Sequence, residues 1–182
     1  MSNEYYKKIM ESIIFVADKP VTIDALKNYF KDLNTPDIKH ILEELVQEWD
    51  GFNRGFKLEA VSGGYHFRTR PDISNEIIEF NKEIKKFRLS RAALEVLAIT
   101  AYKQPLTRVD VDQIRGVDSS GVMNLLLDKR LIEIKGRKEV PGRPFLYVTT
   151  DEFLETFGLN SLKDLPSLKE LEEISKDISE LL

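Results

Sequence analysis

Residues 131–150, LIEIKGRKEVPGRPFLYVTT, decide the fold of the second half of this chain. Segments 131–135 and 145–149 are short and apolar, as expected of two strands. The loop between them is basic and is broken by Pro141, Gly142 and Pro144, of which the prolines stiffen its backbone. Strand, stiff basic loop and strand is the way a winged-helix domain forms its wing. Because winged helices usually bind nucleic acid or another protein, the sequence predicts a binding module and leaves the class of ligand open.

The stretch before this wing has the pattern of three helices. Ser90 is placed to cap the first helix, Thr107 begins a second that ends at Gly116, and Asp118 or Ser119 caps the third. The side chains expected to face the core are Leu94, Leu97, Ala98, Ala101, Val122, Leu125 and Leu126. A closing helix is expected after the wing.

The first half repeats this order of elements. We expect a helix up to residue 17, a second capped by Thr22, a third from 35–36, a hairpin over 56–67 and a fourth helix capped by Asp72. The segment KPVT at 19–22 also resembles QPLT at 104–107. Two copies of one fold explain this repetition better than one large domain, because each copy supplies its own helices and hairpin.

The predicted fold is therefore mainly α with small β-hairpins, an α+β class, built as two tandem winged-helix domains. We expect the domains at residues 1–85 and 90–160, with a linker at 86–89 and an acidic amphipathic or flexible tail at 161–182.

The tail allows two interpretations. Residues 167–170 have a capping-box pattern, which typically begins a helix. The apolar residues that follow on one helical face are Leu171, Ile174, Ile178 and Leu181. A docked terminal helix and a partly disordered tail both fit this sequence.

Composition excludes several functions. The chain of 182 residues has no cysteine, which excludes disulfides and thiol catalysis and fits a reducing cytoplasm. No apolar run approaches the roughly 18 residues that a membrane span needs. His40 and His66 are isolated, and neither has a metal-ligand partner at helical spacing. We therefore predict no catalytic residues, no metal site and no cofactor, and do not expect an enzyme.

Nucleic-acid binding is the main alternative to protein binding. A winged helix that reads DNA places its third helix in the major groove. Here the third helix of the first half carries four acidic residues that phosphates would repel: Asp37, Glu43, Glu44 and Glu48. The net charge of −4 also disfavours general DNA binding. A DNA-binding winged-helix transcriptional regulator nevertheless stays open as the alternative function.

Basic charge gathers instead on the second wing, which carries Lys135, Arg137, Lys138 and Arg143. Three interpretations fit these charges. They contact a phosphate, they bind acidic groups of a protein, or they form a solvated hairpin tip. Gly142 and Pro144 restrict where Arg143 points, which lowers the entropy lost on binding. We therefore predict partner contacts from Arg137, Arg143 and Tyr102, with Gly142 and Pro144 holding the loop.

Aromatic residues gather around the first hairpin. Core packing explains most of them, but an aromatic side chain on the open side would suit self-association. Phe52, set among Gly51, Asn53 and Arg54, is the best candidate. The predicted dimerisation residues are Phe52, Phe56 and Tyr65.

Longer stretches resemble a known family, the bacterial segregation and condensation protein B (ScpB) family. The second half carries the resemblance in LSRAALEVLAITAYKQPLTR at 89–108, IRGVD at 114–118, LIEI at 131–134, PGRPFLY at 141–147 and FLETFGL at 153–159. The first half is similar more loosely, through IIFVADKPV at 13–21.

The resemblance implies two winged-helix domains, homodimerisation through the first and binding of the kleisin subunit ScpA through the second. The kleisin bridges an SMC ATPase in the condensin-like complex that organises and segregates bacterial chromosomes. This chain would therefore reach the SMC ATPase through the kleisin and hold no ATPase itself. The resemblance further implies indirect or weak DNA contact, no membrane contact and a cytoplasmic location at the nucleoid.

Overall fold

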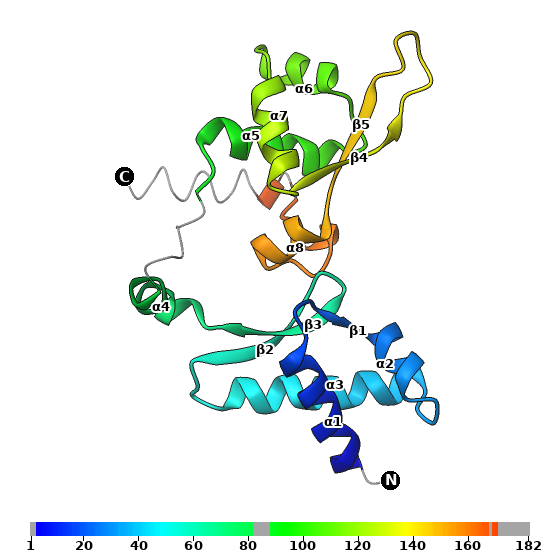
Figure 1. Cartoon of the computed structure of the whole chain (residues 1–182), viewed down its shortest axis with the longest axis vertical. Coiled ribbons are helices and arrows are strands. Elements are labelled where there is room, and N and C mark those ends of the chain that lie inside the picture. Colours follow the sequence, from blue (N-terminus) through cyan, green and yellow to red (C-terminus); the bar gives the residue numbers. More distant parts are fainter. Residues whose placement is uncertain (1–2, 82–87, 168, 171–182) are drawn as a thin grey trace.

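The structure is a computed structural model that describes residues 3–81, 88–167 and 169–170. Its lower half in Figure 1 is the N-terminal unit. In chain order, this unit contains α1 (Asn3–Val16), β1 (Val21–Thr22), α2 (Ile23–Tyr29), α3 (Thr35–Gly51), β2 (Phe56–Val61) and β3 (Gly64–Thr69). Helix, strand, helix, helix and two strands is the element order of a winged helix. The sequence predicts the three helices and the hairpin but not strand β1.

Three antiparallel strands close the N-terminal unit in the order β1, β3, β2. Tyr65 of β3 stands opposite Val21 of β1 and Ala60 of β2. A Cβ at Gly64 would lie 2.9 Å from backbone atoms of Pro20 and Val21, so β1 approaches β3 too closely for any side chain there. The core beneath the sheet and helices includes Met10, Ile14, Leu26, Ile38, Leu42, Leu45 and Leu58.

The fourth helix begins without its predicted cap. A 3-10 turn, η1 (Pro71–Ile73), precedes α4 (Ser74–Phe80), and Ile73 occupies the cap position. Asp72 lies inside the turn because Pro71, with its restricted φ, begins helical geometry one residue earlier. The predicted helix is confirmed and the predicted Asp72 cap is wrong.

The C-terminal unit has the same order of elements. Its helices and strands are α5 (Arg91–Lys103), α6 (Arg108–Arg115), α7 (Ser120–Asp128), β4 (Ile132–Arg137), β5 (Phe145–Thr149), α8 (Asp151–Phe157) and a 3-10 turn, η2 (Leu162–Asp164). Strand β1 has a shorter counterpart, an isolated bridge between Leu106 and Tyr147. Ser90 and Thr107 cap α5 and α6 as predicted, each accepting a backbone N–H at 3.2 Å.

Some side chains predicted to face the core of this unit face outward. Leu94 is 46 % exposed, Leu125 is 41 % exposed and Ala98 is also exposed. Their neighbours Ala93 and Met123 are buried instead. Leu97, Ala101 and Leu126 are buried as predicted. Because α5 and α7 carry apolar residues on more than one face, periodicity alone does not identify every buried position.

The cap of α7 is shared between two residues. Ser119 occupies the N-cap position without a side-chain capping bond, because its hydroxyl accepts a hydrogen bond from Arg115 at 2.9 Å. The Asp118 carboxylate accepts the Ser120 amide at 3.3 Å. The helix therefore begins at the predicted position, with Ser119 as its N-cap residue. The hydrogen bond to the first turn comes from the Asp118 carboxylate.

The two units meet where the turn between β2 and β3 reaches α8 (Figure 1). The Ser62 amide donates to the Leu159 carbonyl at 2.9 Å, and the Gly63 amide donates to the Asn160 carbonyl at 2.9 Å. The Arg68 guanidinium donates to the Glu155 carbonyl at 2.9 Å. The tip of the first wing is thereby engaged within the chain.

Two predicted segments fall largely outside the described residues. These are positions 86–87 of the linker and positions 168 and 171–182 of the tail. Leu159 and Leu165 pack against the core of the C-terminal unit, so the chain stays on this unit beyond α8. Among the helices that the structure describes, none has the length and apolar character to cross a membrane.

Candidate partner-binding surfaces

A tight turn shapes the tip of the second wing. The Val140 carbonyl accepts the Arg143 amide at 2.9 Å, and Pro141 and Gly142 lie between them. Proline at the second position and a glycine with φ of 84° at the third are the signature of a type II turn. Below the turn, the Lys138 amide donates to the Pro144 carbonyl at 2.9 Å. Gly142 thus lies within the turn and the Pro144 carbonyl lies below it, which is compatible with the predicted role of both residues in shaping the loop.

The two arginines of the wing have different environments. The Arg137 guanidinium lies 4.0 Å from the centre of the Phe145 ring and donates to the Arg143 carbonyl at 2.9 Å. Arg143 pairs with Glu139 at 2.7 Å, but the side chains are 64 % and 79 % exposed. Because water screens an exposed pair strongly, the Arg143 charge stays available to a partner. Arg137 is the more restrained of the two.

A groove lies beside the wing, and sequence reasoning missed it. This wing groove has a volume of about 320 Å³ and is lined by residues of α6, α7 and β5, including Arg108, Val109, Met123, Asn124, Phe145 and Tyr147. Val109 is 50 % exposed and Phe145 is 39 % exposed. Periodicity did not identify the groove, because its walls come from three separate elements, α6, α7 and β5, that only the tertiary structure brings together.

The predicted site residue Tyr102 lies on a different surface from the wing. It lines a second groove, called the α5–α8 groove, of about 390 Å³, whose other lining residues include Leu94, Ala98, Phe157, Leu165 and Pro166. The Tyr102 hydroxyl donates to the Pro166 carbonyl at 2.6 Å. The structure thus brings Arg137, Gly142, Arg143 and Pro144 together and leaves Tyr102 apart from them.

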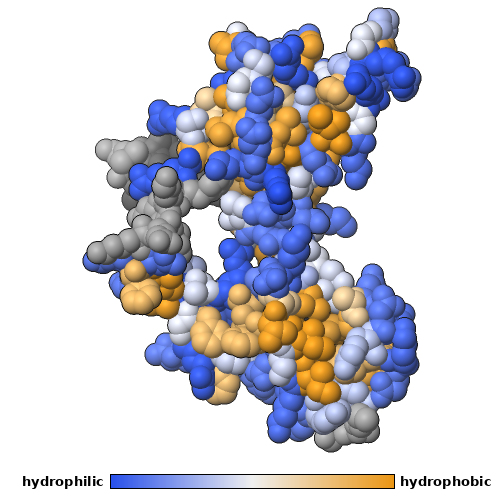
Figure 2. Space-filling view, viewed as in Figure 1, coloured by the Kyte–Doolittle hydropathy of each residue, from blue (hydrophilic) through white to orange (hydrophobic). Residues whose placement is uncertain are grey.

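Aromatic side chains form a continuous ladder on the N-terminal unit. We define this aromatic ladder as Phe15, Trp49, Phe52, Phe56 and Phe67, whose successive ring centres are 5.0–6.2 Å apart. Phe52 is 49 % exposed at one end, and Phe15 is 68 % exposed at the other. Figure 2 shows hydrophobic side chains gathering on this unit.

The ladder contains two of the three predicted dimerisation residues. Phe52 and Phe56 belong to it, whereas Tyr65 is half-buried against the core, where burial raises the pKa of its phenol. Phe15 was not predicted as a surface residue, nor was the neighbouring Val16, which is 76 % exposed. The signal for both was a run of four apolar residues, 13–16, which is longer than one helical face can bury.

Acidic side chains of α3 make ion pairs and capping hydrogen bonds within the N-terminal unit. Lys7 of α1 makes ion pairs with Glu48 at 2.6 Å and with Glu44 at 3.0 Å. These hydrogen bonds, that of Glu48 first, raise the Lys7 pKa and favour the charged amine. Asp37 caps the start of α3. Carboxylates in these positions disfavour approach of a phosphate backbone to α3.

The two histidines have different surroundings. His40 is 69 % exposed at its side chain and lies 3.3 Å from Glu44, whereas His66 Nε2 lies 3.2 Å from the Ala17 carbonyl oxygen. Among residues 3–81, 88–167 and 169–170, no three metal-ligating side chains come together. These surroundings are those of structural side chains.

Comparison with known proteins gives consistent matches. The model of the family described as "Segregation and condensation complex subunit ScpB" matches residues 8–168. A segregation and condensation protein B of Syntrophotalea carbinolica is 48 % identical over 176 residues, which cover 97 % of this chain and 88 % of that protein. One from Clostridium tetani is 47 % identical over 165 residues, covering 91 % and 87 %.

A solved structure gives a weaker match in three dimensions. The crystal structure of ScpB from Mycobacterium tuberculosis is 32 % identical and has a TM-score of 0.42, with 87 % of this chain and 98 % of that chain covered. The family model and the two relatives extend across both units, so the resemblance seen in separate motifs holds for nearly the whole sequence. The chain belongs to the ScpB family and is a subunit of the segregation and condensation complex.

Proposed function

We propose that this subunit binds the kleisin ScpA through its second wing and the wing groove, and forms a homodimer through the aromatic ladder of its N-terminal unit. It works by binding, reaches the SMC ATPase through the kleisin, and resides in the cytoplasm with the nucleoid. The wing carries the first part of this proposal, because its type II turn presents Arg143 beside a partly apolar groove.

The chemistry of this surface suits a peptide segment. Val109 and Phe145 offer apolar contact area. Arg108 lines the same groove, and Arg143 precedes Pro144 of its lining, so both offer exposed positive charge near it. A kleisin segment with an apolar anchor and flanking carboxylates would match both features. Because the turn is already formed, little loop entropy is lost on binding.

Replacing Arg143 with Glu tests the kleisin site. The new carboxylate would face Glu139 and repel an acidic partner segment, so we expect ScpA affinity in calorimetry to fall at least about tenfold, equivalent to about 1.4 kcal/mol. Lys163→Glu in η2 makes the same change of charge away from the wing and serves as the control. Equal affinity of Arg143→Glu and wild type would remove Arg143 from the site.

A further inference from the structure

Arg115 of α6 has a nearly buried charged side chain that the proposed function does not use. The side chain is only 8 % exposed, and burial of a cation is costly unless its donors are paired. Its Nε donates to the Glu95 carboxylate of α5 at 2.9 Å, and its Nη1 donates to the Ser119 hydroxyl at 2.9 Å. Arg115 therefore joins α5, α6 and the start of α7.

Ser119 is the point at which the start of α7 is held against α6. It is fully buried, and its amide donates to the Asp112 carboxylate at 2.7 Å, while its hydroxyl accepts the bond from Arg115. Gly116 ends α6 in the left-handed region, with φ of 73°, and turns the chain back so that Ser119 reaches both side chains. Two side chains of α6 thus fix the amide and the hydroxyl of one residue of the next helix start.

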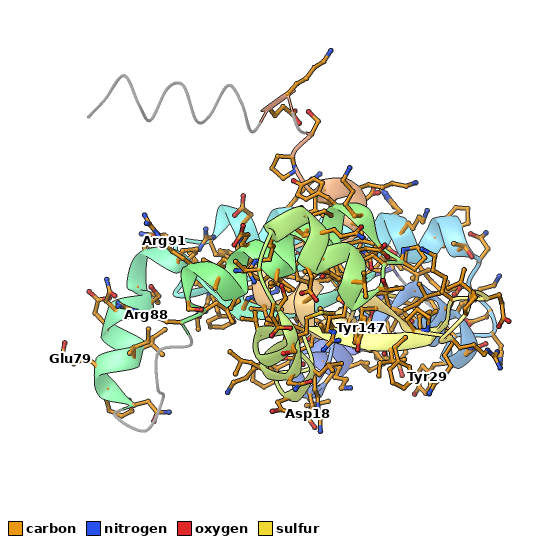
Figure 3. All side chains as sticks on the ribbon, turned by 90° about the horizontal axis from the view of Figure 1, so that it is seen from above. Asp18, Tyr29, Glu79, Arg88, Arg91 and Tyr147 are labelled. Carbon is orange, nitrogen blue, oxygen red and sulfur yellow. The ribbon has the colours of Figure 1, made fainter. Side chains whose placement is uncertain are left out.

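The two helices joined in this way are the helical walls of the wing groove. The lining residues from these helices are Arg108 and Val109 of α6 and Ser120, Met123 and Asn124 of α7. Tyr147 lines the groove from β5 and lies where the second wing meets the helices of the C-terminal unit (Figure 3). The network through Ser119 therefore acts on the spacing of two walls of the proposed kleisin site.

The chemistry of Arg115 suits control of geometry more than gain of stability. A buried charge and its partner often add little net stability, because desolvation offsets their attraction. The guanidinium is planar and its donors point in fixed directions, so it bonds Glu95 and Ser119 together only in a narrow range of helix arrangements. Arg115 thus restricts how far α7 can move from α6.

We propose that Arg115 is a positioning residue of the kleisin site. Through Ser119 it sets the distance between α6 and α7, and so the width of the wing groove. This inference rests on the proposed function, because the groove is the surface to which we assign ScpA. A groove held at a fixed width loses less entropy when a peptide segment enters it. Arg115 therefore supports binding although it lies outside the groove lining.

Calorimetry with ScpA and the full-length protein tests this role. Arg115→Met removes the guanidinium, and we expect the affinity to fall about tenfold. Gln104→Met is the matched control, because Gln104 joins α5 to β5 through bonds to Thr149 at 2.7 and 2.9 Å and does not line the wing groove. This control should lose stability and keep its affinity for ScpA. Urea denaturation checks that each variant is folded at the temperature of the titration.

A double-mutant cycle separates positioning from a general loss of stability. Val109→Ala shortens a side chain of the α6 wall. If Arg115 acts through that wall, the loss of affinity in the double variant should be at least about threefold smaller than the product of the two separate losses. Ser119→Ala removes only the acceptor of the Arg115 bond and should weaken binding in the same direction as Arg115→Met. It decides the question if Arg115→Met does not fold.

A folded Arg115→Met variant that binds ScpA like the wild type would overturn the inference. So would equal losses of affinity in Arg115→Met and Gln104→Met, or independent losses in the cycle, because either result means a general effect of stability. Val109→Glu identifies a failure of the proposed function itself. If this charge within the groove leaves the affinity unchanged, ScpA binds elsewhere and both proposals are wrong.

Discussion

At the scale of single residues, one glycine with a special conformation shapes the tip of the second wing. Gly142 has φ of 84°, a region that residues with a side chain adopt at a cost. Gly136 lies in β4 of the same wing without such a φ, and a Cβ at either position would meet no atom within 4 Å. The two glycines therefore differ in backbone conformation and are alike in the space around them.

Gly142→Ala should lower the free energy of unfolding by about 1 kcal/mol and weaken ScpA binding, since the new side chain disfavours the type II turn. Gly136→Ala should leave both quantities nearly unchanged. Urea denaturation and calorimetry measure the two effects. If both variants bind ScpA like the wild type, the turn does not pre-form the binding surface.

At the scale of secondary structure, α6 depends on a capping box. The Asp110 carboxylate accepts hydrogen bonds from the Thr107 amide and hydroxyl, both at 2.8 Å. These bonds hold the pKa of Asp110 below its usual value. A lowered carboxyl pKa in the folded state means that ionised Asp110 stabilises the fold.

Asp110→Asn should therefore lower the free energy of unfolding at neutral pH by about 0.5–1 kcal/mol, a modest value because the side chain is partly exposed and screened. The contribution is fully present above the ordinary aspartate pKa and is lost as the pH falls through the lower folded-state pKa. Urea denaturation at pH 7 and at about pH 3 should show a smaller difference from wild type at the lower pH, where the carboxyl begins to be protonated. A difference of equal size at both pH values would contradict the ionic role of the cap.

The same local rules explain why the elements were predictable. Thr22, Ser90 and Thr107 cap helices through bonds that span three residues, so their sequence neighbours suffice to identify them. Asp72 failed because Pro71 began the turn earlier. Leu94 and Leu125 were misplaced because an apolar residue can serve either the core or a surface groove, and local sequence does not distinguish the two.

At the scale of the whole molecule, the two units present different surfaces. The first wing tip is bound to the segment after α8 through Ser62 and Gly63, whereas at the tip of the second wing the Arg143 side chain is 64 % exposed. The aromatic ladder lies on the N-terminal unit. This arrangement fits our proposal that the chain dimerises through one unit and holds the kleisin with the other.

Phe15→Glu and Phe52→Glu should each weaken the dimer at least about tenfold, because each places a charge in an apolar contact. Sedimentation velocity over a range of concentrations gives the dissociation constant. Val117→Glu changes a side chain that is 56 % exposed on the C-terminal unit, and should leave the dimer intact. A dimer that tolerates both phenylalanine variants would move the interface away from the ladder.

The sequence by itself determined the helices, the caps at Thr22, Ser90 and Thr107, the wing with its Gly-Arg-Pro tip, the repeated winged-helix order and the family. These features depend on hydrogen bonds and backbone preferences between residues close in the chain. Only the tertiary structure decided that Phe15 is exposed, that Tyr102 faces a groove apart from the wing, and that the first wing tip binds the segment after α8. The physical reason is that exposure and contact depend on which distant elements cover a side chain.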